Sequence, residues 1–116
     1  MTAAGTGGDG LVEVHVTTPD AESALRIARE LVARGEAACV QRVGPITSVY
    51  TWQGETEQAE EWLLLVKTTD EAFPSVCRTV EELHSYDVPE VVAVPITRAL
   101  DAYGAWVRES AGSAPR

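Results

Sequence analysis

Apolar residues recur at every second position in some segments of the chain and at helical spacing in others, and the order of these segments leaves few folds possible. Residues 11–17 (LVEVHVT) alternate valine with glutamate and histidine, a pattern typical of a strand with one wetter face. Residues 21–35 then carry apolar side chains at helical spacing, with Asp20 as the expected N-cap and Gly35 as the stop. The chain therefore begins with a strand and an amphipathic helix.

The middle of the chain predicts a long hairpin. Residues 36–43 form an expected second strand, which Gly44-Pro45 breaks or bulges and residues 46–53 resume. Polar residues around Gly54 turn the chain, and residues 58–69 (QAEEWLLLVKTT) return as a third strand. Residues 46–69 are therefore expected to be an extended hairpin.

The remaining segments add a helix, a strand and a last helix. Asp70 is the expected N-cap of the second helix, whose apolar stripe ends at Leu83. Residues 84–90 (HSYDVPE) form a shaped connection, because Pro89 restricts the backbone before it, and residues 90–96 form the fourth strand. A short last helix is expected to be lined by four residues, Leu100, Tyr103, Trp106 and Val107.

Two strand–helix–strand units that share one antiparallel sheet predict an α+β fold, the ferredoxin-like β-α-β-β-α-β sandwich, with a C-terminal helix added. Right-handed crossovers leave few other arrangements. We expect a single domain over residues 11–110, a disordered leader over residues 1–10 and a disordered tail over residues 111–116, where small and polar residues dominate.

Charge and composition exclude several classes of function. The formal net charge is −9, which repels phosphate backbones, so we expect no nucleic-acid partner. No apolar run approaches the roughly 18–20 residues that span a bilayer, and the N-terminus lacks the features of a secretion signal, so we expect a cytoplasmic protein without membrane contact. Cys39 and Cys77 could form one disulfide, but two free thiols are expected in that compartment.

The strands also predict an assembly. One face of a ferredoxin-like sheet is covered by helices, and a bare second face should carry polar residues at every second position. Residues 62–66 (WLLLV) and 91–96 (VVAVPI) are instead apolar on both faces. A second copy of the chain is the economical cover, so we expect a homo-oligomer.

Several stretches in one order resemble those of the CutA divalent-ion tolerance proteins. They are ALRIARELVARGEAACVQRV, GPITSVYTWQGE, EEWLLLVKTT, LHSYDVPEVVAVPIT and YGAWV, and together they cover about residues 11–109. The resemblance implies a tight homotrimer, similar in architecture to the nitrogen-regulatory PII proteins. It also implies an association with tolerance to copper and other divalent cations, and a divalent cation such as copper as the ligand, though not as a requirement for folding.

The chain departs from the copper-linked members of that family at the proposed ligands. Those members carry a cysteine at the end of the first strand and a His-His pair near the end of the second helix, whereas this chain has Val16 and Leu83-His84. His84 is thus the one candidate metal ligand that survives. The alternative is that His84 caps the helix end by hydrogen bonding. Cys39 is a weaker candidate ligand, because cysteine in an apolar strand behaves as a small hydrophobe.

Four other residues are candidates for a cleft between subunits. Tyr50 and Trp52 share one side of their strand and could form a ligand platform or a subunit interface. Lys67, the only lysine, could bind an anion or pair with a carboxylate such as Glu61 or Glu90. Glu90 opens the fourth strand, where we expect it to be buried and hydrogen-bonded.

No arrangement of nucleophile and base or phosphate-binding loop can be assigned from spacing, so we expect no enzymatic activity. The leading hypothesis is a trimer that acts in the response to metal ions by binding a cation or a partner. The alternatives are a PII-like sensor that binds a small anionic metabolite between subunits, and a scaffold that holds partner proteins.

Overall fold

The computed structural model describes residues 8–112. Four strands and three helices follow one another in the order that the sequence predicts. Their bounds are β1 Leu11–Thr18, α1 Ala21–Ala33, β2 Cys39–Trp52, β3 Glu55–Thr69, α2 Phe73–Leu83, β4 Val91–Pro95 and α3 Asp101–Gly112. None of the described helices is long and apolar enough to cross a membrane.

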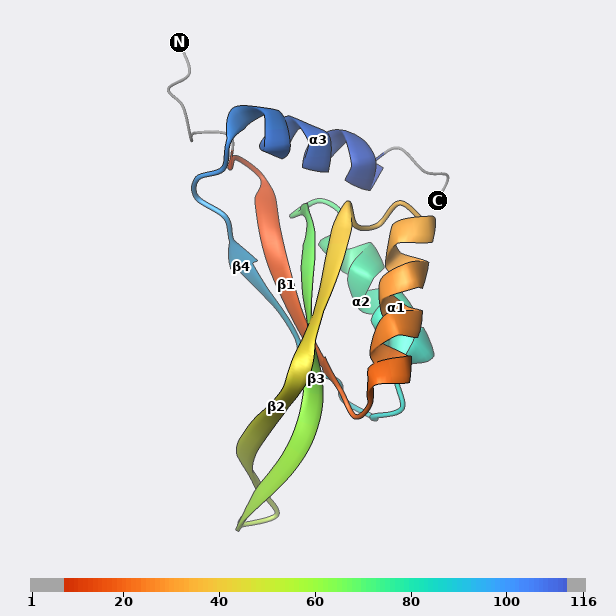
Figure 1. Ribbon diagram of the computed structural model, residues 1–116, viewed down its shortest axis with the longest axis vertical. Coiled ribbons are helices and arrows are strands. Elements are labelled where there is room, and N and C mark those ends of the chain that lie inside the picture. Colours follow the sequence, from red (N-terminus) through yellow and green to blue (C-terminus); the bar gives the residue numbers. More distant parts are fainter. Residues whose placement is uncertain (1–7, 113–116) are drawn as a thin grey trace.

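The strands form one antiparallel sheet in the order β2-β3-β1-β4, which is the ferredoxin-like arrangement. Helices α1 and α2 lie side by side over one face of this sheet (Figure 1). Helix α3 crosses the end of the sheet at which β1 begins and β3 ends (Figure 1). The predicted fold class is confirmed. We call the sheet face opposite α1 and α2 the open face.

The core lies between the sheet and the two helices. The valines of β1 alternate inward and are fully or almost fully buried, as are their neighbours Leu64 and Val66 on β3. They pack in one cluster with the apolar stripes of α1 and α2, which supply Ile27, Leu31 and Val76 among others. The side chains of β1 that alternate with these valines therefore point to the open face.

The first helix begins and ends as predicted. The Asp20 side chain accepts a hydrogen bond of 2.7 Å from the backbone N–H of Ser23, which satisfies one of the free donors of the first turn. Gly35 follows the helix with a φ of 70°, a conformation that glycine adopts without steric cost. The chain then turns through residues 36–38, and the strand predicted to begin at residue 36 begins at Cys39.

The second helix begins later than predicted, and Asp70 is not its N-cap. The N-cap position is occupied by Ala72, whose methyl side chain cannot accept a hydrogen bond. The Thr69 hydroxyl accepts a hydrogen bond from the Ala72 N–H instead, and the Asp70 N–H donates to the carbonyl of Gly10. The reason is tertiary: residue 70 is still tied to the start of β1, so the helix cannot begin there.

A bulge divides β2 as the Gly44-Pro45 pair predicts. The register with β3 shifts between Val43 and Ile46, and the Gly44–Pro45 peptide bond is cis. A Cβ atom on Gly44 would lie 2.6 Å from the indole ring of Trp62 on β3. Trp62 therefore packs directly on the backbone of the bulge, and only glycine leaves room for it.

The two ends of the chain are more ordered than predicted at their inner borders. Residues 8–10 form a turn in which Gly8 is buried and the Asp9 carbonyl accepts two hydrogen bonds from Arg108 of α3. Helix α3 continues to Gly112, into the segment expected to be the tail. The rest of the predicted leader and tail, residues 1–7 and 113–116, lies outside the described residues.

Of the four residues expected to line α3, one is buried in the single chain. Val107 is buried as expected, but its buried companions are small residues, Gly104 and Ala111. Leu100, which precedes the helix, Tyr103 and Trp106 are exposed in the single chain, and the rings of the latter two pack at a tilt with centroids 5.6 Å apart. A sheet end approached closely by a helix favours small side chains at the contact, so the large ones face outward.

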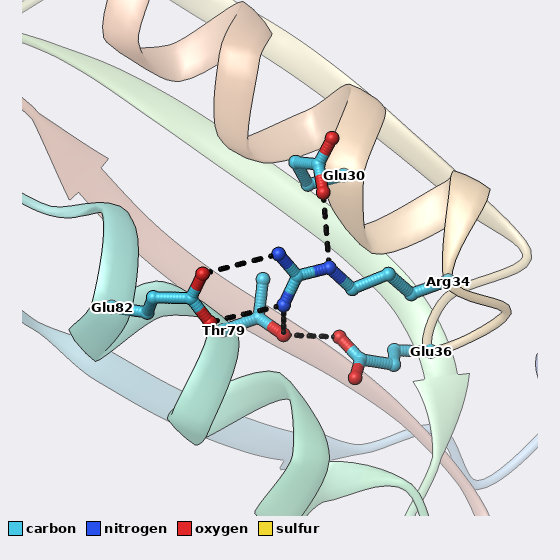
Figure 2. Close-up of polar contacts among 5 residues, drawn as sticks. All are labelled: Glu30, Arg34, Glu36, Thr79 and Glu82. Carbon is cyan, nitrogen blue, oxygen red and sulfur yellow. Dashed lines mark hydrogen bonds and ion pairs between the residues drawn. The ribbon is translucent and has the colours of Figure 1, made fainter. Parts of the chain in front are cut away.

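A network of polar side chains joins α1 to α2 (Figure 2). The Arg34 guanidinium donates to both carboxylate oxygens of Glu82 at 3.2 Å and to Glu30 at 3.0 Å. It also donates to the Thr79 hydroxyl, which in turn donates to the carboxylate of Glu36. The paired donors fix the planar group in one orientation, so the network sets the position of α2 relative to the end of α1.

The Gly44–Trp62 contact generates a prediction about stability. Substitution of Gly44 by Ala should lower the free energy of unfolding by about 1–3 kcal/mol, because the new methyl group and the indole ring cannot both stay in place. Chemical denaturation at one fixed protein concentration measures the change. The exposed Thr47→Ala on the same strand should shift the stability by less than about 0.5 kcal/mol. An equal loss in both variants would contradict the steric reason.

Candidate functional site

A pocket of about 710 Å³ lies beside the part of the β2–β3 hairpin that extends past the end of β1. Only residues 62–69 of β3 pair with β1, so residues 55–61 pair with β2 alone and leave this space beside them. We call it the hairpin pocket. It is lined by Thr17, Ser48, Val49, Tyr50, Trp52, Glu57, Glu61, Tyr86, Asp87, Val88 and Glu90.

The charged side chains that line the hairpin pocket are all acidic. Four carboxylates line it, from Glu57, Glu61, Asp87 and Glu90, and no lysine, arginine or histidine is among the lining residues. Glu61 is only 8% exposed, and its Oε2 accepts a hydrogen bond of 2.9 Å from the hydroxyl of Tyr86. Burial and this carboxylate raise the pKa of Tyr86 to about 12, so the phenol remains a neutral donor.

Three of the predicted cleft residues meet in this pocket. Tyr50 and Trp52 lie on one side of β2, opposite Glu57 and Glu55 of β3, and both aromatic side chains are largely exposed. Glu90 reaches the pocket from the segment before β4 and is exposed, where a buried hydrogen-bonding role was expected. Lys67, the fourth predicted residue, lies outside it, at the opposite end of β3.

His84 ends α2 with both of its ring nitrogens engaged. Its Nε2 lies 2.7 Å from the carbonyl oxygen of Thr17, and its Nδ1 accepts a hydrogen bond of 3.1 Å from the N–H of Tyr86. The ring therefore carries its proton on Nε2, and the His84 and Tyr86 rings pack with centroids 4.6 Å apart. His84 could coordinate a metal only after giving up one of these hydrogen bonds. The two bonds agree with the alternative prediction, in which His84 caps the end of the helix.

A second polar group lies on the open face, which we call the open-face cluster: Glu13, His15, Gln41 and Lys67. The imidazole Nε2 of His15 lies 2.7 Å from Oε2 of Glu13. Lys67 Nζ lies 3.5 Å from Oε1 of Glu13 and donates to Gln41 at 2.6 Å. Lys67 thus pairs with a carboxylate, as one of its two alternatives predicted, although its partner is Glu13.

In the open-face cluster, the negative charge of Glu13 is paired with the positive charge of Lys67. The hydrogen bond from His15, and then the positive charge of Lys67, lower the pKa of Glu13 despite its partial burial. Nδ1 of His15 makes no hydrogen bond with the described residues. His15 was not among the candidates from sequence. The available signal was the alternation of β1, which places residues 13 and 15 together on the wetter face.

Both cysteines are free thiols, as predicted, and both are half-buried. Cys39 pairs with Lys67 in the β2–β3 ladder and so lies on the open face next to the open-face cluster. Burial raises the pKa of Cys77, which makes its thiolate scarce. Within residues 8–112, no three side chains of histidine, cysteine, aspartate or glutamate are close enough to hold a metal ion together.

The Tyr86–Glu61 bond generates a prediction about pH. The phenol of Tyr86 should ionise near pH 12, whereas an unfolded tyrosine ionises near pH 10. The raised pKa contributes stability that is complete below about pH 10 and is lost as the pH rises through about 12. Glu61→Gln should move the pKa of Tyr86 downward. Ultraviolet titration of the phenolate measures this pKa, and Tyr86→Phe identifies which part of the tyrosine titration curve belongs to Tyr86. An unchanged titration in Glu61→Gln would contradict the assignment.

The chain is similar in sequence to known proteins over most of its length. The family model described as CutA1 divalent ion tolerance protein matches residues 12–110. The divalent-cation tolerance protein CutA of Thermus thermophilus is 48% identical over 99 residues, which are 85% of this chain and 96% of the relative. The chloroplastic CutA of Arabidopsis thaliana is 39% identical over 85% of this chain, which spans 54% of that relative.

Solved structures agree with these sequence matches. The structure of the divalent cation tolerance protein Cut A1 from Thermus thermophilus matches with a TM-score of 0.85 and 47% identity, over 86% of this chain and 97% of that one. The structure of CutA from Archaeoglobus fulgidus, described as a periplasmic divalent cation tolerance protein, matches with a TM-score of 0.84 and 38% identity, over 87% of this chain and 98% of that one. The resemblance stated from the sequence is confirmed, and the chain belongs to the CutA1 divalent ion tolerance protein family.

Proposed function

We propose that the protein acts in tolerance of divalent cations as a homotrimer that binds the cation, copper in particular, through His15 on the open face of its sheet. The proposal extends the family membership, since the family and its relatives are named for tolerance of divalent cations. The observation that carries it is the imidazole of His15, whose Nε2 is held by Glu13 and whose Nδ1 makes no hydrogen bond with the described residues.

The pairing of His15 with Glu13 has the form of a prepared metal ligand. Histidines that bind metals usually give their second ring N–H to a carboxylate or carbonyl, which fixes the tautomer and makes the other nitrogen a better donor. The 2.7 Å contact between His15 and Glu13 supplies this arrangement. His84, the only other histidine of the chain, lacks it, because both of its nitrogens are already bonded.

The exposed apolar surface supports the homotrimer. Val92 and Val94 of β4 are 49% and 43% exposed, and they lie directly beside His15 and Glu13 in the β1–β4 ladder. Their neighbours across β1 are Leu65 and Lys67, so apolar side chains flank His15 on both sides. Exposed apolar side chains on a sheet face are normally covered by another chain.

A trimer would also supply the missing ligands. One imidazole binds copper weakly, and useful sites need at least two donors. If the open faces of three copies meet around a threefold axis, they bring three equivalent imidazoles and, next to them, three Cys39 thiols toward that axis.

Binding without catalysis is the mode of action we propose. A cysteine nucleophile needs a lowered pKa, and the shift of Cys77 is upward because of burial. The alternative of an anionic metabolite has less support. Lys67, its expected ligand, is occupied by Gln41 and Glu13, and carboxylates line the hairpin pocket.

Copper titration by calorimetry tests the role of His15. The protein should bind Cu²⁺ saturably, and His15→Ala should abolish this binding, whereas the matched variant His84→Ala should retain it. Glu13→Ala should weaken the affinity about 10- to 100-fold, because the imidazole loses its orienting carboxylate. Retained binding in His15→Ala, or loss only in His84→Ala, would show that the ligand has been assigned to the wrong histidine.

Light scattering tests the assembly. The protein should have three times the mass of its chain at micromolar concentration, and Val92→Asp should lower that mass, because it buries a charge in the interface. Val32→Asp is the matched control, since Val32 is 46% exposed on α1, on the helical side of the molecule. A monomer in the unmodified protein, or an equal effect of both variants, argues against the open face as the interface.

A further inference from the structure

We propose that the hairpin pocket binds a small organic cation, an alkylammonium ion with a hydrocarbon chain. This site lies apart from the open-face cluster, which contributes none of the lining residues. The inference therefore does not depend on copper binding at His15. It is supported by the charge of the pocket, by one buried carboxylate, by the aromatic side chains and by the size of the space.

The buried carboxylate is Glu61. Only 8% of this residue is exposed, and carboxylates buried to this extent are normally paired with a cation. Glu61 forms no ion pair with the described residues, and of its two oxygens only Oε2 makes a hydrogen bond, to the Tyr86 hydroxyl. The Oε1 atom is left for a donor that enters the pocket. An ammonium group carries three such donors and the opposite charge.

The charge around Glu61 favours the same class of ligand. Glu57, Asp87 and Glu90 line the same space, with no basic side chain among the lining residues to offset them. Carboxylates that line one space make its electrostatic potential negative, which attracts a cation. The same field repels phosphates and carboxylates, so an anionic ligand does not fit this pocket.

The aromatic and apolar lining indicates that the cation is organic. Trp52 is 62% exposed and Tyr50 lies on the same side of β2, so two ring faces or edges border the pocket next to the carboxylates. Aromatic rings attract ammonium groups through their negative faces, and Val49 and Val88 offer surface for a hydrocarbon chain. A bare metal ion would use neither.

The size of the pocket fits this class as well. Its volume of about 710 Å³ falls within the range of roughly 300–1,000 Å³ that is typical of small-molecule sites. A metal ion needs several ligands within about 2–2.6 Å, and the described residues bring no three donor side chains together. The pocket therefore suits a molecule with several carbon atoms better than an ion.

Calorimetric titration with 1,5-diaminopentane as the probe tests the proposal on the full chain. Saturable binding is expected, and it should weaken at high salt, because the attraction is between charges. Glutarate, which has the same number of carbon atoms and the opposite charge, should not bind. Equal binding of the two compounds, or no saturation by the diamine up to about 10 mM, which is weaker than a typical specific site, overturns the proposal.

Variants locate the binding within the chain. Glu61→Gln should weaken the diamine affinity by at least about tenfold, which corresponds to about 1.4 kcal/mol. Glu60→Gln is the matched control, because Glu60 is exposed and its side chain points to the other side of β3 from Glu61, where it pairs with Thr47. The diamine affinity of this variant should stay within about twofold of the unmodified protein, as for a charge at the rim of a site. Trp52→Ala, at an exposed position, should weaken binding without unfolding the protein, which circular dichroism checks for each variant.

The remaining arms separate this site from the copper site. His15→Ala should leave the diamine affinity unchanged, and Cu²⁺ should not compete with the diamine. Loss of diamine binding in His15→Ala, or displacement of the diamine by stoichiometric Cu²⁺, would show that the two ligands share one site and would overturn the inference. Failure of copper binding alone leaves the diamine result intact, so the two proposals fail separately.

Discussion

The antiparallel pairing of β1 with β3 is the interaction from which the other features of the molecule follow. It joins eight residue pairs, from Leu11 with Thr69 to Thr18 with Trp62. Because side chains alternate along both strands, this register sends the valines of β1 toward the helices and Glu13 and His15 to the open face. A slip by one residue would reverse both sets. The buried valines therefore fix the position of the polar cluster as firmly as they fix the core.

The same pairing creates the hairpin pocket through a difference in length. β1 has 8 residues and β3 has 15, so β3 continues past the end of β1 with β2 as its only partner. The connection after α2 passes beside this extension and brings Tyr86 to Glu61. Two kinds of surface result. The four-stranded part presents apolar residues around His15, and the two-stranded part presents carboxylates and aromatic rings.

The sequence predicted the features that depend on local pattern and missed those that depend on contacts distant in the chain. The order of elements, the Asp20 cap and the bulge at Gly44-Pro45 follow from residues close together, and all three are present. Asp70 is not the cap because it is tied to Gly10, 60 residues away in the chain, and α3 buries small residues within the single chain because its packing surface is the end of the sheet. Neither contact has a local signal.

The candidate site divides in the same way. Tyr50, Trp52 and Glu90, which were predicted for a cleft between subunits, line one pocket of the single chain, and the strand alternation and the position of Glu90 after a turn that bring them there are local features. The buried state of Glu61 was not predictable, because it depends on Tyr86 reaching across from the connection after α2. His15 was overlooked for a related reason. Its pairing with Glu13 is visible only once strand geometry places the two side chains on one face at hydrogen-bonding distance.

The two parts of β3 also differ in local stability, because one part has a neighbouring strand on each side and the other has one on a single side. Residues 63–67 pair with a strand on each side within the four-stranded sheet, whereas residues 55–61 belong to a ribbon of two strands, which alone is marginally stable in water. Backbone amides in the ribbon can exchange with solvent through local opening that leaves the core closed, while those near Leu64 exchange only with global unfolding. Glu61 lies at the border between these regimes. A ligand bound to Glu61 would therefore slow the local opening of the whole two-stranded ribbon.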